Sequence, residues 1–147
     1  ERADIVGAYY RRLTSNDRAE RIRAARAWSI CEGSTSRLIP DPQLISRTGD
    51  ETFAEAFARI ECHYFVNGGF FQSDNQLLEN IHRNEQIPAV IVQGRYDVVC
   101  PAESAHQLHR AWKNSRLEIA ERSGHSALEP EITSLLIAAT TGHSPTR

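Results

Sequence analysis

An unbroken run of β-branched residues ends at a glycine, and an acid follows three residues later in a turn. The run is Val90-Ile91-Val92, the glycine is Gly94 and the acid is Asp97. Apolar runs of this length without polar alternation are typical of a strand buried on both faces, as in a parallel sheet. Open α/β sheets place ligands and catalytic groups at the carboxyl ends of their strands, so we expect Asp97 to lie at such an edge.

A histidine follows the next strand expected along the chain. One helical stretch and one short strand separate Asp97 from His125. An acid after one strand and a histidine after the next is the order of these two residues in the α/β-hydrolase triad. There the aspartate fixes the imidazole tautomer while the imidazole takes the proton of a serine hydroxyl. The pair predicts half of a catalytic triad, although Asp97 could instead cap the following helix and His125 could be an ordinary loop histidine.

The nucleophile of such a triad is missing from the sequence. No Gly-x-Ser-x-Gly elbow occurs in the chain, and in α/β-hydrolases the serine precedes both the acid and the histidine. A serine nucleophile would therefore lie before Glu1. The chain also contains no methionine. We expect a piece of a longer protein, lacking the amino-terminal half of the hydrolase domain.

Composition limits the classes of partner and the compartment. The 147 residues suffice for a domain with a core, and the 17 basic and 19 acidic side chains nearly balance. This balance gives no indication of a nucleic-acid partner. No apolar run approaches the roughly 20 residues of a membrane helix, so we expect no membrane partner. Three cysteines without a Cys-x-x-Cys pair favour free thiols in a reducing compartment, and we expect a cytoplasmic protein.

The first eighty residues predict helices. Asp17 is expected to cap a helix that turns Ile22, Ala25 and Trp28 inward. Residues 33–50, which contain two prolines, are expected to form a long loop.

A further helix is expected over residues 51–65, ended by Gly68-Gly69. Glu61 lies four residues after Phe57 and four before Phe65, so it shares a flank with aromatic rings. Ser73 and Gln76 have the spacing of a capping box that would start a short helix. The apolar stripe of the longer helix is expected to consist of Phe53, Phe57, Ile60 and Tyr64.

The last sixty residues predict an α/β arrangement. The buried strand is followed by a helix over residues 102–112 and a strand over residues 117–120, which together form one right-handed βαβ unit. A last helix follows Pro130.

Several separate motifs carry a resemblance to a known family. Residues 94–101 (Gly-Arg-Tyr-Asp-Val-Val-Cys-Pro) and 124–127 (Gly-His-Ser-Ala) resemble the acid and histidine segments of bacterial proline iminopeptidases, also called prolyl aminopeptidases. Residues 28–33 and 59–65 resemble that family's helical cap. The resemblance implies a serine exopeptidase of the α/β-hydrolase superfamily, which releases N-terminal proline from peptides without a metal or organic cofactor.

The resemblance also implies an organisation and a role for single residues. Residues 1–82 would form the helical cap, and residues 83–147 the carboxy-terminal part of the α/β-hydrolase domain. Asp97 would be the triad acid and His125 the triad base.

Three cap residues match substrate-binding positions of the family. Glu32 and Glu61 match acids that bind the free amino terminus of the substrate, and Phe65 matches a ring that packs on the proline side chain. Carboxylates suit an ammonium group because charge-assisted hydrogen bonds are strong, and an aromatic wall suits a pyrrolidine ring. The ordinary state of each glutamate is nonetheless a solvated helix position.

Other interpretations stay open. The chain could be a non-catalytic, truncated hydrolase-like binding module, or part of an α/β-hydrolase of other specificity such as an esterase. His106 and His109 stand at i, i+3 without a third ligand, so we expect no metal site. Cys100 is expected near the site as a small buried hydrophobe rather than a nucleophile.

Overall fold

The computed structural model describes residues 3–141, which fall into two compact units. The first comprises the residues up to Ser34 together with Pro40–Gln72, and the second comprises Thr35–Ile39 together with the residues from Ser73 onward. This boundary lies before residue 82 because the short helix after Ser73 packs against a helix of the second unit. The assignment of a cap to residues 1–82 stays a prediction.

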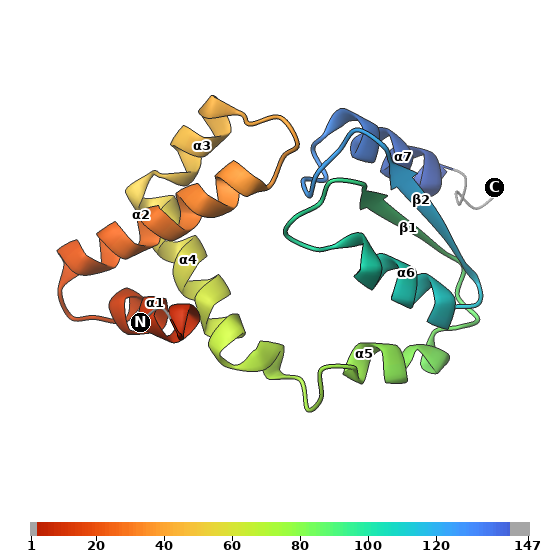
Figure 1. Cartoon of the computed structure of the whole chain (residues 1–147), viewed down its shortest axis with the longest axis horizontal. Coiled ribbons are helices and arrows are strands. Elements are labelled where there is room, and N and C mark those ends of the chain that lie inside the picture. The colour runs from red at the N-terminus through yellow and green to blue at the C-terminus, as the bar shows by residue number, and fades with distance from the viewer. Residues whose placement is uncertain (1–2, 142–147) are drawn as a thin grey trace. The chain divides into compact units, whose positions relative to one another are not determined.

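The elements are labelled in Figure 1. In the first unit they are α1 (Ile5–Leu13), α2 (Arg18–Thr35), α3 (Pro42–Thr48), α4 (Glu51–Val66) and the 3₁₀ turn η1 (Gly68–Phe70). In the second unit they are α5 (Gln76–Glu79), the 3₁₀ turn η2 (Ile81–Arg83), β1 (Ala89–Gly94), α6 (Ala102–Ala111), β2 (Ser115–Ala120) and α7 (Pro130–Thr141). Among the described residues, none of the helices combines the length and apolar character needed to cross a membrane.

The start and inward face of α2 are as predicted. The Ala19 backbone N–H donates to Asp17 Oδ1 over 2.9 Å, which satisfies one of the free amides of the first turn. Ile22, Ala25 and Trp28 are buried.

The buried face of α4 differs from the predicted aromatic stripe. Ala54, Ala58 and Cys62 are fully buried, whereas Phe53, Ile60 and Tyr64 are exposed and Phe57 is half-buried. Small side chains at i, i+4 and i+8 let the neighbouring helices approach closely, and α1 packs there, with Cys62 Sγ 3.6 Å from the Val6 carbonyl. Burial raises the pKa of the Cys62 thiol.

The long loop predicted over residues 33–50 is wrong. Helix α2 continues to Thr35 and α3 begins at Pro42. Asp41 caps α3 through Oδ1, which accepts from the N–H groups of Gln43 at 3.0 Å and Leu44 at 3.1 Å. The pair Asp41-Pro42 indicates the start of a helix, because the aspartate caps the helix and proline is favoured at the first helical position.

The segment between α4 and α5 confirms one local prediction and contradicts another. Gly68 and Gly69 have φ of 56° and 62°, so the left-handed glycines follow the helix end as expected. The capping box is not formed. Asn75 precedes α5 without a side-chain cap, and the Ser73 hydroxyl donates to Glu79 Oε2 over 3.4 Å. The helix begins at Gln76, so Ser73 lies two residues before the N-cap and Gln76 is the first helical residue instead of the third.

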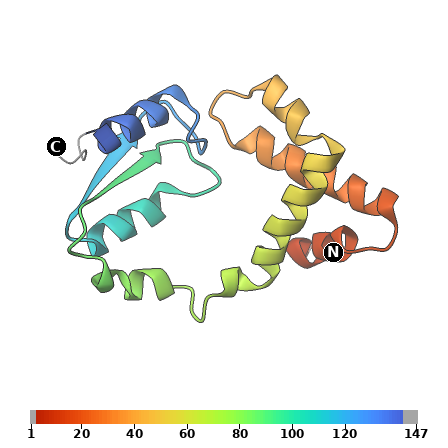
Figure 2. The same ribbon diagram turned by 180° about the vertical axis from the view of Figure 1, so that it is seen from behind.

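The sheet of the second unit confirms the α/β class. Strands β1 and β2 pair in parallel, from Ala89 opposite Ser115 to Gly94 opposite Ala120. Helices α6 and α7 cover opposite faces of the sheet (Figures 1 and 2). Residues 89–92 are half-buried, and only the last two residues of β1 are buried. Complete burial of β1 on both faces is therefore wrong, because β2 is its only neighbouring strand in the described chain.

The Arg21–Glu55 ion pair, which joins α2 to α4, gives a pH-dependent prediction. Arg21 Nε donates to Glu55 Oε1 over 2.8 Å, and its NH1 donates to the Ser15 carbonyl over 2.8 Å. The hydrogen bond from Arg21 lowers the pKa of Glu55. A depressed carboxyl pKa adds stability above the ordinary pKa, and this stability is lost as the pH falls through the folded-state pKa.

Glu55→Gln should therefore cost about 0.5–1 kcal/mol in free energy of unfolding at pH 7, and the difference should shrink as the pH falls below about 4.3, the ordinary glutamate pKa. Urea unfolding at both pH values measures it. Glu51→Gln is the control, since Glu51 and its partner Arg18 are at least half exposed. A difference that grew on acidification would contradict the prediction.

Candidate active site

Asp97 lies in the turn after β1, and both of its carboxylate oxygens are engaged. Oδ1 accepts from the backbone N–H groups of Val99 at 2.9 Å and Cys100 at 2.8 Å. The side chain of Asp97 is 6% exposed. The turn therefore fixes the carboxylate and leaves Oδ2 for another partner.

That partner is His125, in the loop after β2. The Nδ1 atom of His125 lies 3.0 Å from Asp97 Oδ2. A carboxylate only accepts, so Nδ1 carries the hydrogen and donates, and Nε2 of the neutral ring is left as the acceptor. The His125 side chain is 41% exposed, so the ring is open to a further partner. Such a ring can take a proton at Nε2 while Asp97 stabilises the charge.

The two loops meet because a glycine ends β1. A Cβ on Gly94 would lie 1.8 Å from the carbonyl oxygen of Gly124, which no side chain tolerates. The Tyr96 N–H donates to the Ser123 carbonyl over 3.0 Å, and the Arg95 N–H donates to the Ala120 carbonyl over 2.9 Å. Glycine at position 94 thus permits the close approach that brings His125 to Asp97.

Gly94→Ala should displace the histidine loop. The added methyl group would meet backbone atoms instead of a flexible side chain. We therefore expect a loss of about 1–3 kcal/mol in free energy of unfolding. Gly49→Ala is the control, since its Cβ would lie 3.2 Å from the end of the Ile30 side chain and no closer than 3.5 Å to the Ser46 carbonyl oxygen, the nearest backbone atom given for it. Equal midpoints of unfolding for the two variants would show that the approach is not tight.

Gln93 is a supporting residue that the sequence analysis missed. Its buried amide donates from Nε2 to the Cys100 carbonyl at 3.0 Å and lies 3.4 Å from Asp97 Oδ2. A polar residue at the end of a β-branched run is the signal that could have found it, because a buried amide needs partners. Cys100 itself adjoins Asp97 as predicted but is exposed rather than buried, since its turn leaves the sheet.

The predicted substrate-binding residues lie in the first unit. Glu61 Oε2 accepts from the indole N–H of Trp28 over 2.6 Å, and the ring of Phe65 lies 5.9 Å from that of Trp28, between centroids. Trp28 thus brings Glu61 and Phe65 together on one side of α4. Glu32 is half-buried on α2, one turn after Trp28.

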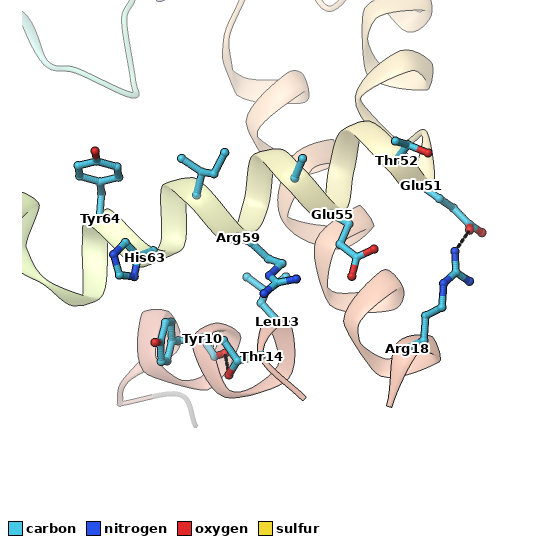
Figure 3. A pocket seen from close by; sticks show the side chains of 12 residues that line it. Tyr10, Leu13, Thr14, Arg18, Glu51, Thr52, Glu55, Arg59, His63 and Tyr64 are labelled. Carbon is cyan, nitrogen blue, oxygen red and sulfur yellow. Dashed lines mark hydrogen bonds and ion pairs between the residues drawn. The ribbon is translucent and has the colours of Figure 1, made fainter. Parts of the chain in front are cut away.

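A cavity of the first unit does not contain these residues. It has a volume of about 730 Å³, lies between α1 and α4, and is lined by polar and aromatic side chains that include Arg18, Arg59 and Tyr64 (Figure 3). None of the predicted site residues lines it. The candidate site is instead the hydrogen-bonded pair of Asp97 and His125, which has groups that can transfer a proton. Within residues 3–141, no group of three acidic, histidine or cysteine side chains could hold a metal ion.

Comparison with known proteins identifies the family. A family model described as TAP-like protein, of the α/β-hydrolase type, matches residues 50–139. The chain belongs to this family. The matched segment contains Glu61, Phe65, Asp97 and His125, whereas Glu32 lies outside it.

Curated relatives of this TAP-like chain carry the name expected from the motifs. A probable proline iminopeptidase of Leptolyngbya boryana is 59% identical over 95% of this chain and 44% of its own length. The proline iminopeptidase of Xanthomonas citri is 56% identical over 97% of this chain and 45% of its own length. That of Arabidopsis thaliana is 47% identical over 93% and 36%. The resemblance is confirmed, and the chain spans less than half the length of these relatives.

Proposed function

We propose that this chain supplies the acid and the base of a Ser-His-Asp triad in a serine hydrolase. The observation that carries the proposal is the 3.0 Å contact between His125 Nδ1 and a buried Asp97 carboxylate whose other oxygen is already held by the turn. Nε2 of His125 takes the proton of the attacking serine and later delivers it to the leaving amine. Asp97 keeps the ring in the required tautomer.

The nucleophile in this proposal belongs to a longer protein that contains this chain. None of the 147 residues forms a Gly-x-Ser-x-Gly elbow, and the relatives are more than twice as long as the matched segment. The serine and the oxyanion-binding amides would come from the remaining sequence. The 147 residues alone would then contain the base, His125, but no serine nucleophile for it to activate.

The substrate we propose is a peptide with an N-terminal proline, as the names of the relatives indicate. Glu61 and Glu32 would receive the secondary ammonium group of that proline. Phe65, which is 53% exposed, offers an apolar face for the pyrrolidine ring. Trp28 supports this role because its indole N–H orients the Glu61 carboxylate and leaves Oε1 for a ligand.

No cofactor is needed for this chemistry, because the serine, imidazole and carboxylate provide both the nucleophile and the proton transfers. We further propose the cytoplasm as the location. No disulfide joins Cys31, Cys62 and Cys100, as expected for cysteines in a reducing compartment.

Substrate comparison with the longer protein tests the proposal. Prolyl, alanyl and N-acetyl-prolyl chromogenic amides and a simple ester are assayed side by side. We expect the prolyl amide with a free amine to have the highest kcat/KM. Preference for the ester would instead indicate an esterase, and no hydrolysis of any substrate would indicate a binding module.

A further inference from the structure

A buried acid that the triad does not use lies directly behind the histidine loop. Glu129 immediately precedes α7 and is 6% exposed. Its backbone carbonyl accepts the Thr133 N–H at the start of the helix, over 2.9 Å, while its side chain accepts hydrogen bonds from residues outside the helix. A buried carboxylate is retained only where donors compensate it, so its contacts indicate its purpose.

Two backbone amides from distant parts of the chain provide that compensation. Glu129 Oε1 accepts from the Gly124 N–H over 2.6 Å, and Oε2 accepts from the Leu38 N–H over 3.2 Å. Glu129 therefore bridges the residue before His125 to the segment between α2 and α3.

The same segment holds the next two amides of the histidine loop. The Ser36 carbonyl accepts from the His125 N–H at 3.0 Å and from the Ser126 N–H at 2.7 Å. Three consecutive N–H groups, from Gly124 to Ser126, are thus fixed either by Glu129 or by the segment that Glu129 holds. A Cβ on Gly124 would lie 2.9 Å from the Leu38 nitrogen, so the segment lies directly against the loop.

We propose that Glu129 is a positioning residue for His125. It acts through the backbone: by joining Gly124 to Leu38 it keeps Ser36 in place, and together they hold the imidazole facing Asp97. An exposed ring on a loop has few packing contacts of its own, so its direction depends on these amides. The expected change in kcat rests on the proposed function. The hydrogen bond between Asp97 and His125 can be observed without any catalytic activity.

The test compares Glu129→Gln with Glu131→Gln in the longer protein. Glutamine at 129 keeps the size of the side chain but presents an NH₂ group to one of two N–H donors, so one bridge is lost. Glu131 is the matched control, since its Oε2 accepts a backbone N–H of the same loop, that of Arg122, over 2.8 Å. Glu129→Asp keeps the charge but is too short to span both donors.

The direct readout is the low-field proton resonance of His125 Nδ1, which reports the hydrogen bond to Asp97. We expect Glu129→Gln to shift or broaden it and to lower kcat for the prolyl amide at least tenfold with KM unchanged. Glu129→Asp should give a smaller loss, and Glu131→Gln should leave both readouts as in the wild type.

Two results would overturn the inference. One is a Glu129→Gln variant that loses thermal stability but keeps the wild-type resonance and kcat, as a purely structural acid would. The other, if Glu129→Gln does not fold, is a Glu129→Asp variant with an unchanged resonance. If the wild-type protein hydrolyses no substrate while Glu129→Gln still alters the resonance, the positioning role stands and the proposed function fails.

Discussion

Replacing Asp97 by asparagine in the longer protein should lower kcat by about 10⁴ with little change in KM. The amide can still accept the Val99 and Cys100 N–H groups through its oxygen, so the turn after β1 is retained. Its NH₂ group, however, faces Nδ1 of His125 and favours the tautomer that places the hydrogen on Nε2. That nitrogen can then no longer take a proton from serine, and no charge remains to stabilise the imidazolium.

Steady-state kinetics with a prolyl amide measure this loss. Because the substitution preserves the hydrogen bonds of the turn, it separates catalysis from capping. Glu121→Gln is the control, since Glu121 pairs with Arg95 on the exposed surface of the same unit. A loss of less than tenfold for Asp97→Asn would identify Asp97 as a structural turn residue.

The second large effect concerns recognition of the substrate amine. Glu61→Gln removes the charge while the Gln oxygen still accepts the Trp28 indole N–H, so the packing of α4 against α2 is preserved. Removing one partner of a desolvated charge pair costs about 2–5 kcal/mol, which is roughly thirtyfold and upward in kcat/KM. We expect this loss on substrates with a free N-terminal proline, and for Glu32→Gln as well.

Substrates whose amine is blocked should be spared, because they bring no charge for the carboxylates to bind. Glu51→Gln, on the exposed start of α4, provides the control on both substrates. Equal losses on free and blocked substrates would show that Glu61 and Glu32 only support the helices around them.

The sequence predicted those features whose signals are local. The β-branched run, Gly94 and Asp97 together indicate a buried strand end with an acid, and the order of Asp97 and His125 predicted a pair that lies in contact. A residue that carries its own signal, such as the capping Asp17, was placed correctly.

Features that depend on contacts between distant segments could not be predicted in this way. The Leu38–Glu129 bridge joins residues 91 positions apart, and the Ser36 carbonyl is a backbone group that any residue would supply. The buried face of α4 was misplaced because aromatic rings dominate an apolar pattern, whereas close helix packing selects Ala54 and Ala58. The start of α3 at Asp41-Pro42 did carry a signal, but the two prolines favoured a loop.

The central claim is that His125 and Asp97 activate a serine that this chain does not contain. A phosphonate probe that reacts with activated serine hydroxyls tests it most directly. The longer protein is labelled, the modified residue is located by mass spectrometry, and the labelling is repeated with His125→Ala. We predict one modified serine, outside these 147 residues, and loss of labelling in the variant. A modified serine within the 147 residues, or labelling that His125→Ala leaves unchanged, would contradict the claim.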